Sequence, residues 1–205
     1  MSEREATDPI LGGRFEGAFA YAHFLHRRQL RKGGDVPYMA HLMGVAALVL
    51  EDGGDEDEAV AALLHDAVED AGAVPGGGIP ILNEIRRRYG DRVALIVEEV
   101  TDHDPAQDRP EWHIRKKRYV ESLPERTASH RVSLADKLYN ARALLSDYRQ
   151  VGDQVWLRFS AGREVLGYLR ALADAFSEHT KSPMAADLDV TVGELERLAA
   201  DAAHS

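Results

Sequence analysis

Apolar side chains recur along this chain at intervals of three or four residues, in blocks that glycine and proline separate. In the first block Phe15, Phe19 and Ala22 share one face, at the spacing of an amphipathic α-helix. The same pattern predicts helices over residues 14–32, 38–50, 55–70, 81–89, 92–101, 112–123, 129–145, 154–176 and 192–203. No alternation of period two is long enough to predict a β-strand. The chain is therefore predicted to be all-α.

Turn-forming residues mark the ends of these helices. Gly33–Gly34 and Gly53–Gly54 interrupt the apolar pattern, because glycine destabilises a helix interior. Asp55 is a predicted N-cap, since a short polar side chain accepts hydrogen bonds from the free N–H groups of the first turn. Two segments rich in glycine, proline and polar residues, 72–80 and 102–110, are predicted loops.

Length and composition indicate one globular domain. The chain has 205 residues, and a domain typically has about 100–200. With 44% apolar and 29% charged residues, it can bury a core and is not of the disordered class. We expect a single domain over 1–205, with a core over about 14–178 and a helical tail over 183–205.

The charge balance argues against several classes of partner. Asp and Glu number 35 and Lys and Arg number 25, which gives a net charge of −10. Non-specific binding to a nucleic-acid polymer needs a basic surface, as does docking on anionic lipid. The longest strongly apolar stretch, 43–50, is far shorter than the roughly 20 residues that span a bilayer. We expect neither a nucleic-acid polymer nor a membrane as partner.

Cysteine is absent from the chain. This excludes disulfides, a thiol nucleophile and a thiolate zinc site. The first nine residues are polar and charged and have no apolar segment typical of a signal peptide. The expected location is the cytoplasm.

The first segment with candidate chemistry is His65-Asp66-Ala67-Val68-Glu69-Asp70. At 100° per residue, Glu69 lies one helical turn beyond His65, and Asp70 one turn beyond Asp66. His65 and Asp66 could both reach one metal ion, with Glu69 and Asp70 beside it. A solvated polar helix end is the alternative. However, carboxylates at a helix C-terminus oppose the helix dipole, which a bound cation would compensate.

Two further segments place polar groups among apolar ones. His41 lies on the apolar face of its predicted helix, with Val45 and Leu48. Asp136 lies within an apolar run, and Asn140 follows one turn later. A carboxylate in such a place must be paired or bind a metal. The alternatives are a hydrogen-bonded core histidine and a buried salt bridge.

His41, His65, Asp66 and Asp136 together form a set of two imidazoles and two carboxylates. This set suits manganese, iron or zinc. The order His, His-Asp, Asp across successive helices is the HD-domain signature. The sequence resembles the HD hydrolase domain of the RelA/SpoT alarmone enzymes. Within that family it resembles the stand-alone small alarmone hydrolases of the metazoan SpoT-homologue type.

Three motifs carry this resemblance, which covers about residues 18–176. They are Arg31-Lys32-Gly33-Gly34 followed by Pro37-Tyr38-x-x-His41, then Ala62-Leu63-Leu64-His65-Asp66-x-Val68-Glu69-Asp70, and Leu134-Ala135-Asp136-Lys137-Leu138-x-Asn140-x-Arg142. The Glu69-Asp70 pair makes the match more specific than a bare His-Asp pair. The resemblance implies an HD-domain bundle of about eight to ten helices.

The resemblance also implies a function. The four metal donors would hold a single Mn²⁺ ion, with Zn or Fe as alternatives. Glu69 and Asp70 would activate or orient the hydrolytic water, and Glu69 is the favoured base. The implied reaction removes pyrophosphate from the ribose 3′-position of ppGpp or pppGpp and leaves GDP or GTP.

The resemblance also implies substrate contacts at a few positions. Arg31 and Lys32 match a pair at the rim of the pocket, where a guanidinium can stack on a purine. Asn140 matches an asparagine near the ribose. Arg158 and Arg163 are further candidates.

Other residues are expected to lie outside the site. The run 115–118 has four cationic residues, which either face solvent or capture phosphate. His103, His113 and His130 are predicted surface residues, and Trp112 and Tyr139 predicted packing residues.

Several alternatives stay open. The nucleotide could carry adenine, as in ppApp, or be NADPH with its 2′-phosphate. An HD nucleotidase or phosphodiesterase acting on dNMPs or cyclic nucleotides is a second function. A non-catalytic module that binds a nucleotide and regulates a partner is a third. The oligomeric state is open between monomer and homodimer.

Overall fold

The computed structural model describes residues 10–70, 77–103, 108 and 110–203. Within these residues the chain forms nine α-helices and three short 3-10 helices, and its one β-bridge joins Leu30 and Pro37. The α-helices are α1 Gly13–His26, α2 Met39–Glu51, α3 Glu56–Leu64, α4 Ile79–Tyr89, α5 Asp91–Val100, α6 Trp112–Ser122, α7 His130–Val151, α8 Glu164–His179 and α9 Pro183–Ala203. The 3-10 helices are η1 Leu123–Glu125, η2 Thr127–Ser129 and η3 Gly152–Arg158. The prediction of an all-α chain is confirmed.

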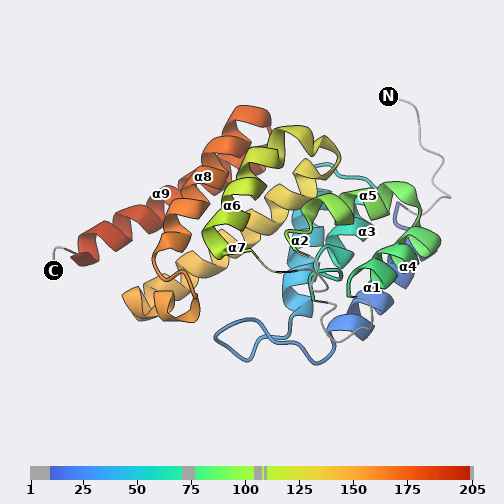
Figure 1. The fold of residues 1–205 in the computed structure, drawn as a ribbon, viewed down its shortest axis with the longest axis horizontal. Coiled ribbons are helices and arrows are strands. Elements are labelled where there is room, and N and C mark those ends of the chain that lie inside the picture. Colours follow the sequence, from blue (N-terminus) through green and yellow to red (C-terminus); the bar gives the residue numbers. More distant parts are fainter. Residues whose placement is uncertain (1–9, 71–76, 104–107, 109, 204–205) are drawn as a thin grey trace.

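Helices α2 and α7 lie at the centre of the bundle. Helices α1, α3, α4 and α5 gather on one side of them, and α6, α8 and α9 on the other (Figure 1). Leu42 and Val45 of α2 and Leu138 of α7 are completely buried. This burial of apolar surface is the main favourable contribution to the stability of the bundle. Among the described residues, no helix is both long and apolar enough to cross a membrane.

The predicted helix boundary at Asp55 is confirmed. Its side chain accepts a hydrogen bond from the Glu58 N–H, and the Glu58 carboxylate accepts one from the Asp55 N–H. This capping box satisfies two of the free donors at the start of α3. The separation of α4 from α5 at Gly90 is also confirmed, and the φ of 95° there favours glycine.

The first helix is shorter than predicted. It ends at His26, and the predicted range to residue 32 is wrong. The Gln29 N–H donates to the His26 carbonyl, and the chain then doubles back, with Arg31 N bonded to Val36 O and Tyr38 N bonded to Gln29 O. We call residues 29–38 the hairpin. The backbone hydrogen bonds between its two arms replace those that a continued helix would make.

Helix α3 is also shorter than predicted, because it ends at Leu64 and not at residue 70. Segment 65–70 forms turns, although one bond of helical type persists from Asp70 N–H to the Asp66 carbonyl. The Nδ1 atom of His65 lies 2.8 Å from the Ala62 carbonyl oxygen, so the imidazole competes with the backbone for this acceptor. The acidic residues therefore lie beyond the helix and not on its last turns.

The C-terminal third differs from the prediction in three places. Helix α7 continues to Val151 and ends at Gly152, where φ is 57°. The single predicted helix over 154–176 is wrong, because η3 and α8 are separated by a turn that includes Gly162 at φ 55°. The last helix starts at Pro183 and not at residue 192, since proline is well tolerated at a helix start.

Candidate functional site

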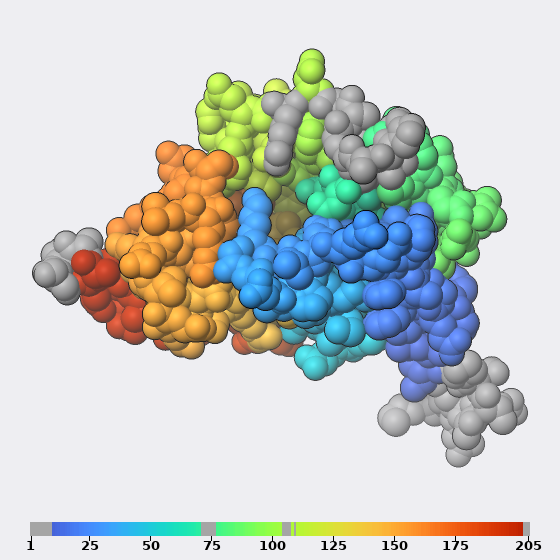
Figure 2. Space-filling view, turned by 90° about the horizontal axis from the view of Figure 1, so that it is seen from below, coloured from blue at the N-terminus to red at the C-terminus, as the bar shows by residue number. Residues whose placement is uncertain are grey.

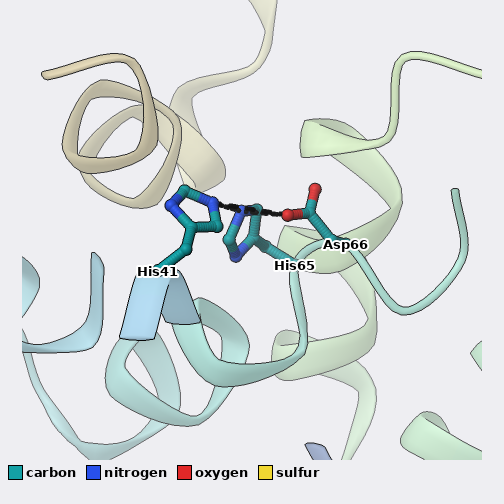
Figure 3. A group of neighbouring side chains, drawn as sticks. All are labelled: His41, His65 and Asp66. Carbon is teal, nitrogen blue, oxygen red and sulfur yellow. Dashed lines mark hydrogen bonds and ion pairs between the residues drawn. The ribbon is translucent and has the colours of Figure 1, made fainter. Parts of the chain in front are cut away.

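His41, His65 and Asp66 converge where α2 meets the turn after α3. Their ligand atoms all lie within 4.8 Å of one another. The two Nε2 atoms are 3.2 Å apart, and Asp66 Oδ2 lies 2.9 Å from that of His65 and 3.4 Å from that of His41. Both rings and the carboxylate point toward one another (Figure 3). We call these three residues and Asp136 the donor cluster.

Asp136 reaches this cluster from α7. Its Oδ1 atom lies 3.3 Å from the Nε2 of His41 and 3.7 Å from that of His65. Asp136 is buried, with 7% of its surface exposed. The structure therefore brings together the four residues predicted from sequence to hold the metal.

The donor cluster fits a divalent cation. A carbonyl oxygen only accepts, so the 2.8 Å contact with Ala62 places the proton of a neutral His65 ring on Nδ1. The Nε2 lone pair of His65 then faces the cluster. Two imidazole nitrogens and two carboxylate oxygens, with nitrogen–oxygen distances of 2.9–3.7 Å, leave converging lone pairs for a cation to neutralise.

The imidazoles and carboxylates of the donor cluster shift one another's pKa values. Burial disfavours a charged His65 ring, but Asp66 and Asp136 outweigh burial and raise the pKa of His65 well above its usual value. Burial also opposes ionisation of Asp66, yet the charge of His65 and hydrogen bonds from both histidines hold the Asp66 pKa well below its usual value. These contacts favour the protonated form of His65 and the ionised form of Asp66.

Uptake of a divalent metal at pH 7 is consequently expected to release about one proton per ion. A metal ligand must be unprotonated, so affinity should rise with pH until the raised pKa of His65 is passed, and should fall as the pH drops. Calorimetric titrations in two buffers with different ionisation enthalpies measure the number of protons released. A value of zero would contradict the protonated state of the metal-free cluster.

A ring of polar groups holds the donors in place. The Tyr38 hydroxyl donates to Asp66 Oδ2 at 2.6 Å. Lys137 Nζ and Asn140 Nδ2 each donate to Asp136, both at 2.6 Å. Such outer partners orient metal ligands and affect affinity strongly. No role was predicted for Tyr38, although it lies three residues before His41 in the first motif of the resemblance.

Glu69 and Asp70 lie beside the cluster. Burial, followed by the nearby charge of Asp66, raises the pKa of Glu69 to about 7. Burial also raises the pKa of Asp70. Glu69 Oε1 accepts a hydrogen bond from the Asp102 N–H at 2.6 Å. A carboxylate with a pKa near neutrality is suited to accept a proton from water.

A second set of charges surrounds Asp102. Its carboxylate pairs with Arg115 and Lys116, so these two residues of the cationic run do not face solvent. Burial, followed by the like charge of Lys137, lowers the pKa of Lys116 to about 7. The same region borders a cavity of about 510 Å³ that Val68, Asp102 and Arg115 help to line.

The predicted substrate contacts divide into two groups. Arg31 and Asn140 are brought together, because Arg31 donates to the Asn140 side-chain oxygen at 3.0 Å. Lys32 is exposed on the hairpin. Arg158 pairs with Asp147 at 2.5 Å. Arg163 donates to a backbone carbonyl of α9 at 2.6 Å, a contact that ties α9 to the bundle and does not involve the donor cluster.

The space-filling view shows a hollow on the surface of the molecule (Figure 2). It opens between the blue segment that includes the hairpin, the orange segment that includes η3 and the start of α8, and the lime-green helix α6 (Figure 2). Arg158 lies close to the hairpin here, since a Cβ on Gly33 would lie 2.5 Å from its Cδ. Gly33 also has a φ of 81°. Both the left-handed backbone and the lack of space for a Cβ therefore favour glycine at this position.

Tyr139 packs against the His41 ring of the donor cluster. Its ring lies 5.1 Å from the His41 ring, its hydroxyl donates to the Ala40 carbonyl, and the Arg31 guanidinium lies over the ring, 5.3 Å from its centre. Gly44 makes room for it, because a Cβ there would lie 2.0 Å from a ring carbon of Tyr139. Tyr139 therefore packs as predicted.

Replacement of Gly44 by alanine is expected to destabilise the protein by about 1–3 kcal/mol, the usual effect of overpacking. The displaced Tyr139 ring should also disturb His41 and weaken metal binding. Urea denaturation and metal titration test both effects. Gly167→Ala is the control, since nothing lies near a Cβ there, and it should gain up to about 1 kcal/mol of helix stability. Equal effects of both substitutions would contradict the packing argument.

The three histidines predicted to lie at the surface are outside the donor cluster. His113 is exposed, with 66% of its side-chain surface accessible, and His103 and His130 are half-buried. His130 is therefore only partly the surface residue predicted, because its Nε2 atom donates to the Leu123 carbonyl and its ring contacts Phe176. Trp112 is half-buried and packs edge-on against the Tyr168 ring.

Comparison with known proteins shows the family. The model of the HD domain matches residues 18–167. Guanosine-3′,5′-bis(diphosphate) 3′-pyrophosphohydrolase MESH1 of Mus musculus is 40% identical over 128 residues, which are 60% of this chain and 65% of that protein. MESH1 of Drosophila melanogaster is 34% identical over 143 residues, covering 68% of this chain and 73% of that protein.

The fold is similar to that of a solved relative. That structure is described as a metazoan ortholog of SpoT that hydrolyzes ppGpp and plays a role in starvation responses. It matches with a TM-score of 0.68 and 26% identity, over 94% of this chain and 97% of its own. The HD-domain match implies binding of a divalent metal ion, for which the donor cluster offers ligands. The chain belongs to the HD-domain family and is related to the metazoan SpoT homologues.

Proposed function

We propose that the protein is a metal-dependent hydrolase that removes the 3′-pyrophosphate of (p)ppGpp and leaves GDP or GTP. One observation carries this proposal. The donor cluster of His41, His65, Asp66 and Asp136 lies beside two further carboxylates, Glu69 and Asp70. Relatives that match about 60% of this chain are named as hydrolases of this substrate.

The reaction is a hydrolysis at the phosphorus atom bonded to the ribose 3′-oxygen. Water forms the new bond to phosphorus, the bond to the 3′-oxygen breaks, and pyrophosphate leaves. The water loses one proton, and the 3′-oxygen takes up one to become a hydroxyl. A bound divalent ion would lower the pKa of water and neutralise charge that develops on the phosphoryl oxygens.

In this mechanism Glu69 accepts the proton from water. Its high pKa makes it a stronger base than an ordinary carboxylate. Asp70 orients the same water. Lys137 and Asn140 keep Asp136 in place through their hydrogen bonds.

The substrate would lie in the hollow beside the hairpin. The planar guanidinium of Arg31, already held by Asn140 and Tyr139, offers a face on which a purine can stack. Lys32, exposed on the hairpin, would attract phosphate, and so would Arg158 if its guanidinium is shared with Asp147. Arg163 is a weaker candidate, because its guanidinium is occupied by a carbonyl of α9.

Finer features belong to the same proposal. Nitrogen and carboxylate donors without sulfur support Mn²⁺ as the native ion, with Zn or Fe as alternatives. A chain without cysteine fits the reducing cytoplasm. We place the whole activity in one domain over 1–205.

A product assay tests this function. The Mn²⁺-loaded protein would be offered ppGpp, ppApp, NADPH and a dNMP, and pyrophosphate and orthophosphate would be measured separately. Release of pyrophosphate from ppGpp supports the proposal, and its release from ppApp alone would move the base preference to adenine. Orthophosphate from NADPH or the dNMP alone would contradict the reaction class. No turnover of any substrate would favour a non-catalytic binding module.

A further inference from the structure

The Asp70 carboxylate is held by a neutral side chain. Gln29 Nε2 donates to Asp70 Oδ2 at 2.7 Å. Asp70 lies on the turn after α3 with 36% of its side-chain surface exposed, so a carboxylate without a partner there could rotate. A neutral amide fixes its direction without the charge that an arginine or lysine would bring.

Gln29 is itself fixed at three points. Its backbone N–H donates to the His26 carbonyl, and its carbonyl accepts from the Tyr38 N–H, both at 2.9 Å. Its side-chain oxygen lies 2.7 Å from His26 Nδ1. A carboxylate only accepts, so the amide nitrogen must face Asp70 and the amide oxygen must face His26. His26 Nδ1 therefore carries a proton and donates it.

His26 links this contact to the donor cluster. It is the last residue of α1 and is buried, with 3% of its surface exposed. Its ring stacks on Tyr38, with ring centres 5.3 Å apart and an angle of 25° between the planes. The Tyr38 hydroxyl donates to Asp66. One buried ring therefore contacts both the residue that holds Asp70 and the residue that holds Asp66.

We propose that His26 and Gln29 are positioning residues, which hold the Asp70 carboxylate at a fixed angle to the donor cluster. The inference rests on the proposed function, in which Asp70 orients the hydrolytic water. His26 acts through Gln29, because it selects the amide orientation that presents a donor to Asp70, and its own Nδ1 atom lies beyond hydrogen-bond distance of Asp70 Oδ2, at 3.8 Å. A reversed amide would place its oxygen against the carboxylate, which is repulsive.

Gln29→Glu tests the first step. The side chain keeps its shape but loses the donor and gains a negative charge 2.7 Å from Asp70 Oδ2. We expect kcat to fall about 10- to 100-fold, as for other residues that orient catalytic groups. KM and metal content should change little. Gln150→Glu is the matched control, since Gln150 is exposed and bonds only locally, to Ser146.

A double-mutant cycle tests the second step. His26→Phe keeps the ring against Tyr38 but removes the Nδ1 donor, so kcat should fall. In a Gln29→Leu background the same change should have almost no further effect on kcat, because residues acting through one contact are not additive. Additive losses would overturn the proposed order of action.

An NMR measurement is independent of activity. The side-chain amide resonances of Gln29 should shift in Asp70→Ala and stay unchanged in Asp187→Ala. If they stay unchanged in both, the contact is absent in solution and the inference fails. The inference also fails if Gln29→Glu and Gln29→Leu keep the wild-type kcat. An inactive wild type with the expected amide shift would overturn the proposed function alone and leave the contact in place.

Discussion

Replacement of Asp66 by alanine is expected to abolish metal binding and, with it, turnover. Asp66 Oδ2 lies within 3.4 Å of both imidazole Nε2 atoms, so its loss removes the charge that balances a cation there. Loss of an outer partner already lowers metal affinity about 10- to 100-fold, and loss of a direct donor should exceed this. The Tyr38 hydroxyl also loses its hydrogen-bond acceptor. The Tyr38 side chain is then held less firmly beside the donor cluster.

Metal content after dialysis and thermal unfolding measure this effect. A ligand at 100 times its Kd stabilises the folded state by about 2.7 kcal/mol. For a chain of this length that corresponds to a rise in Tm of about 5–11 °C. Asp66→Ala should show no such rise with Mn²⁺. Asp187→Ala, which removes only an exposed partner of Arg142, should behave as wild type. Full metal occupancy in Asp66→Ala would refute its assignment as a ligand.

The helical class could be predicted from sequence, because apolar spacing reports directly on which face is buried. The ends of several helices could not. Segment 65–70 continues the helical spacing, yet His65 turns its ring onto the Ala62 carbonyl and the chain leaves the helix. Residues 27–32 likewise continue the helical pattern of α1 but form the hairpin. In both places specific local contacts outweigh the helical pattern: a side-chain contact with the backbone at His65, and the hydrogen bonds of the hairpin after His26.

The donor cluster could be anticipated because its members have chemical signatures: His41 and Asp136 lie among apolar residues, and His65-Asp66 is an adjacent pair near two further carboxylates. Its supports have no such signature. Gln29 is an ordinary polar residue, and only the hairpin brings it to Asp70, 41 positions away. Arg163 shows the reverse case: its charge suggested phosphate, but the fold places it against α9. Residue type identifies candidate donors, while the tertiary fold decides what each one faces.

Glu69→Gln is expected to lower kcat by about 10²- to 10⁴-fold, the usual contribution of a general base. Glutamine separates two roles of this side chain. Its amide oxygen can still accept the hydrogen bond from the Asp102 N–H, so the segment at Asp102 stays attached and the metal stays bound. Only the ability to take a proton from water is lost. Glu69→Ala removes both roles and should also destabilise this segment.

The pH dependence of kcat distinguishes a base from a residue that only orients water. Glu69 must be ionised to act, so the rate should rise with pH through its pKa, which is about 7 in the metal-free site. A bound divalent cation favours the ionised form, and the rise in the loaded enzyme should therefore lie below pH 7. Glu69→Gln should lose this rise and become flat over the same range, while Asp70→Asn should keep it at a lower rate. If Asp70→Asn loses the rise and Glu69→Gln keeps it, the assignment is reversed, with Asp70 as the base and Glu69 as the residue that orients water.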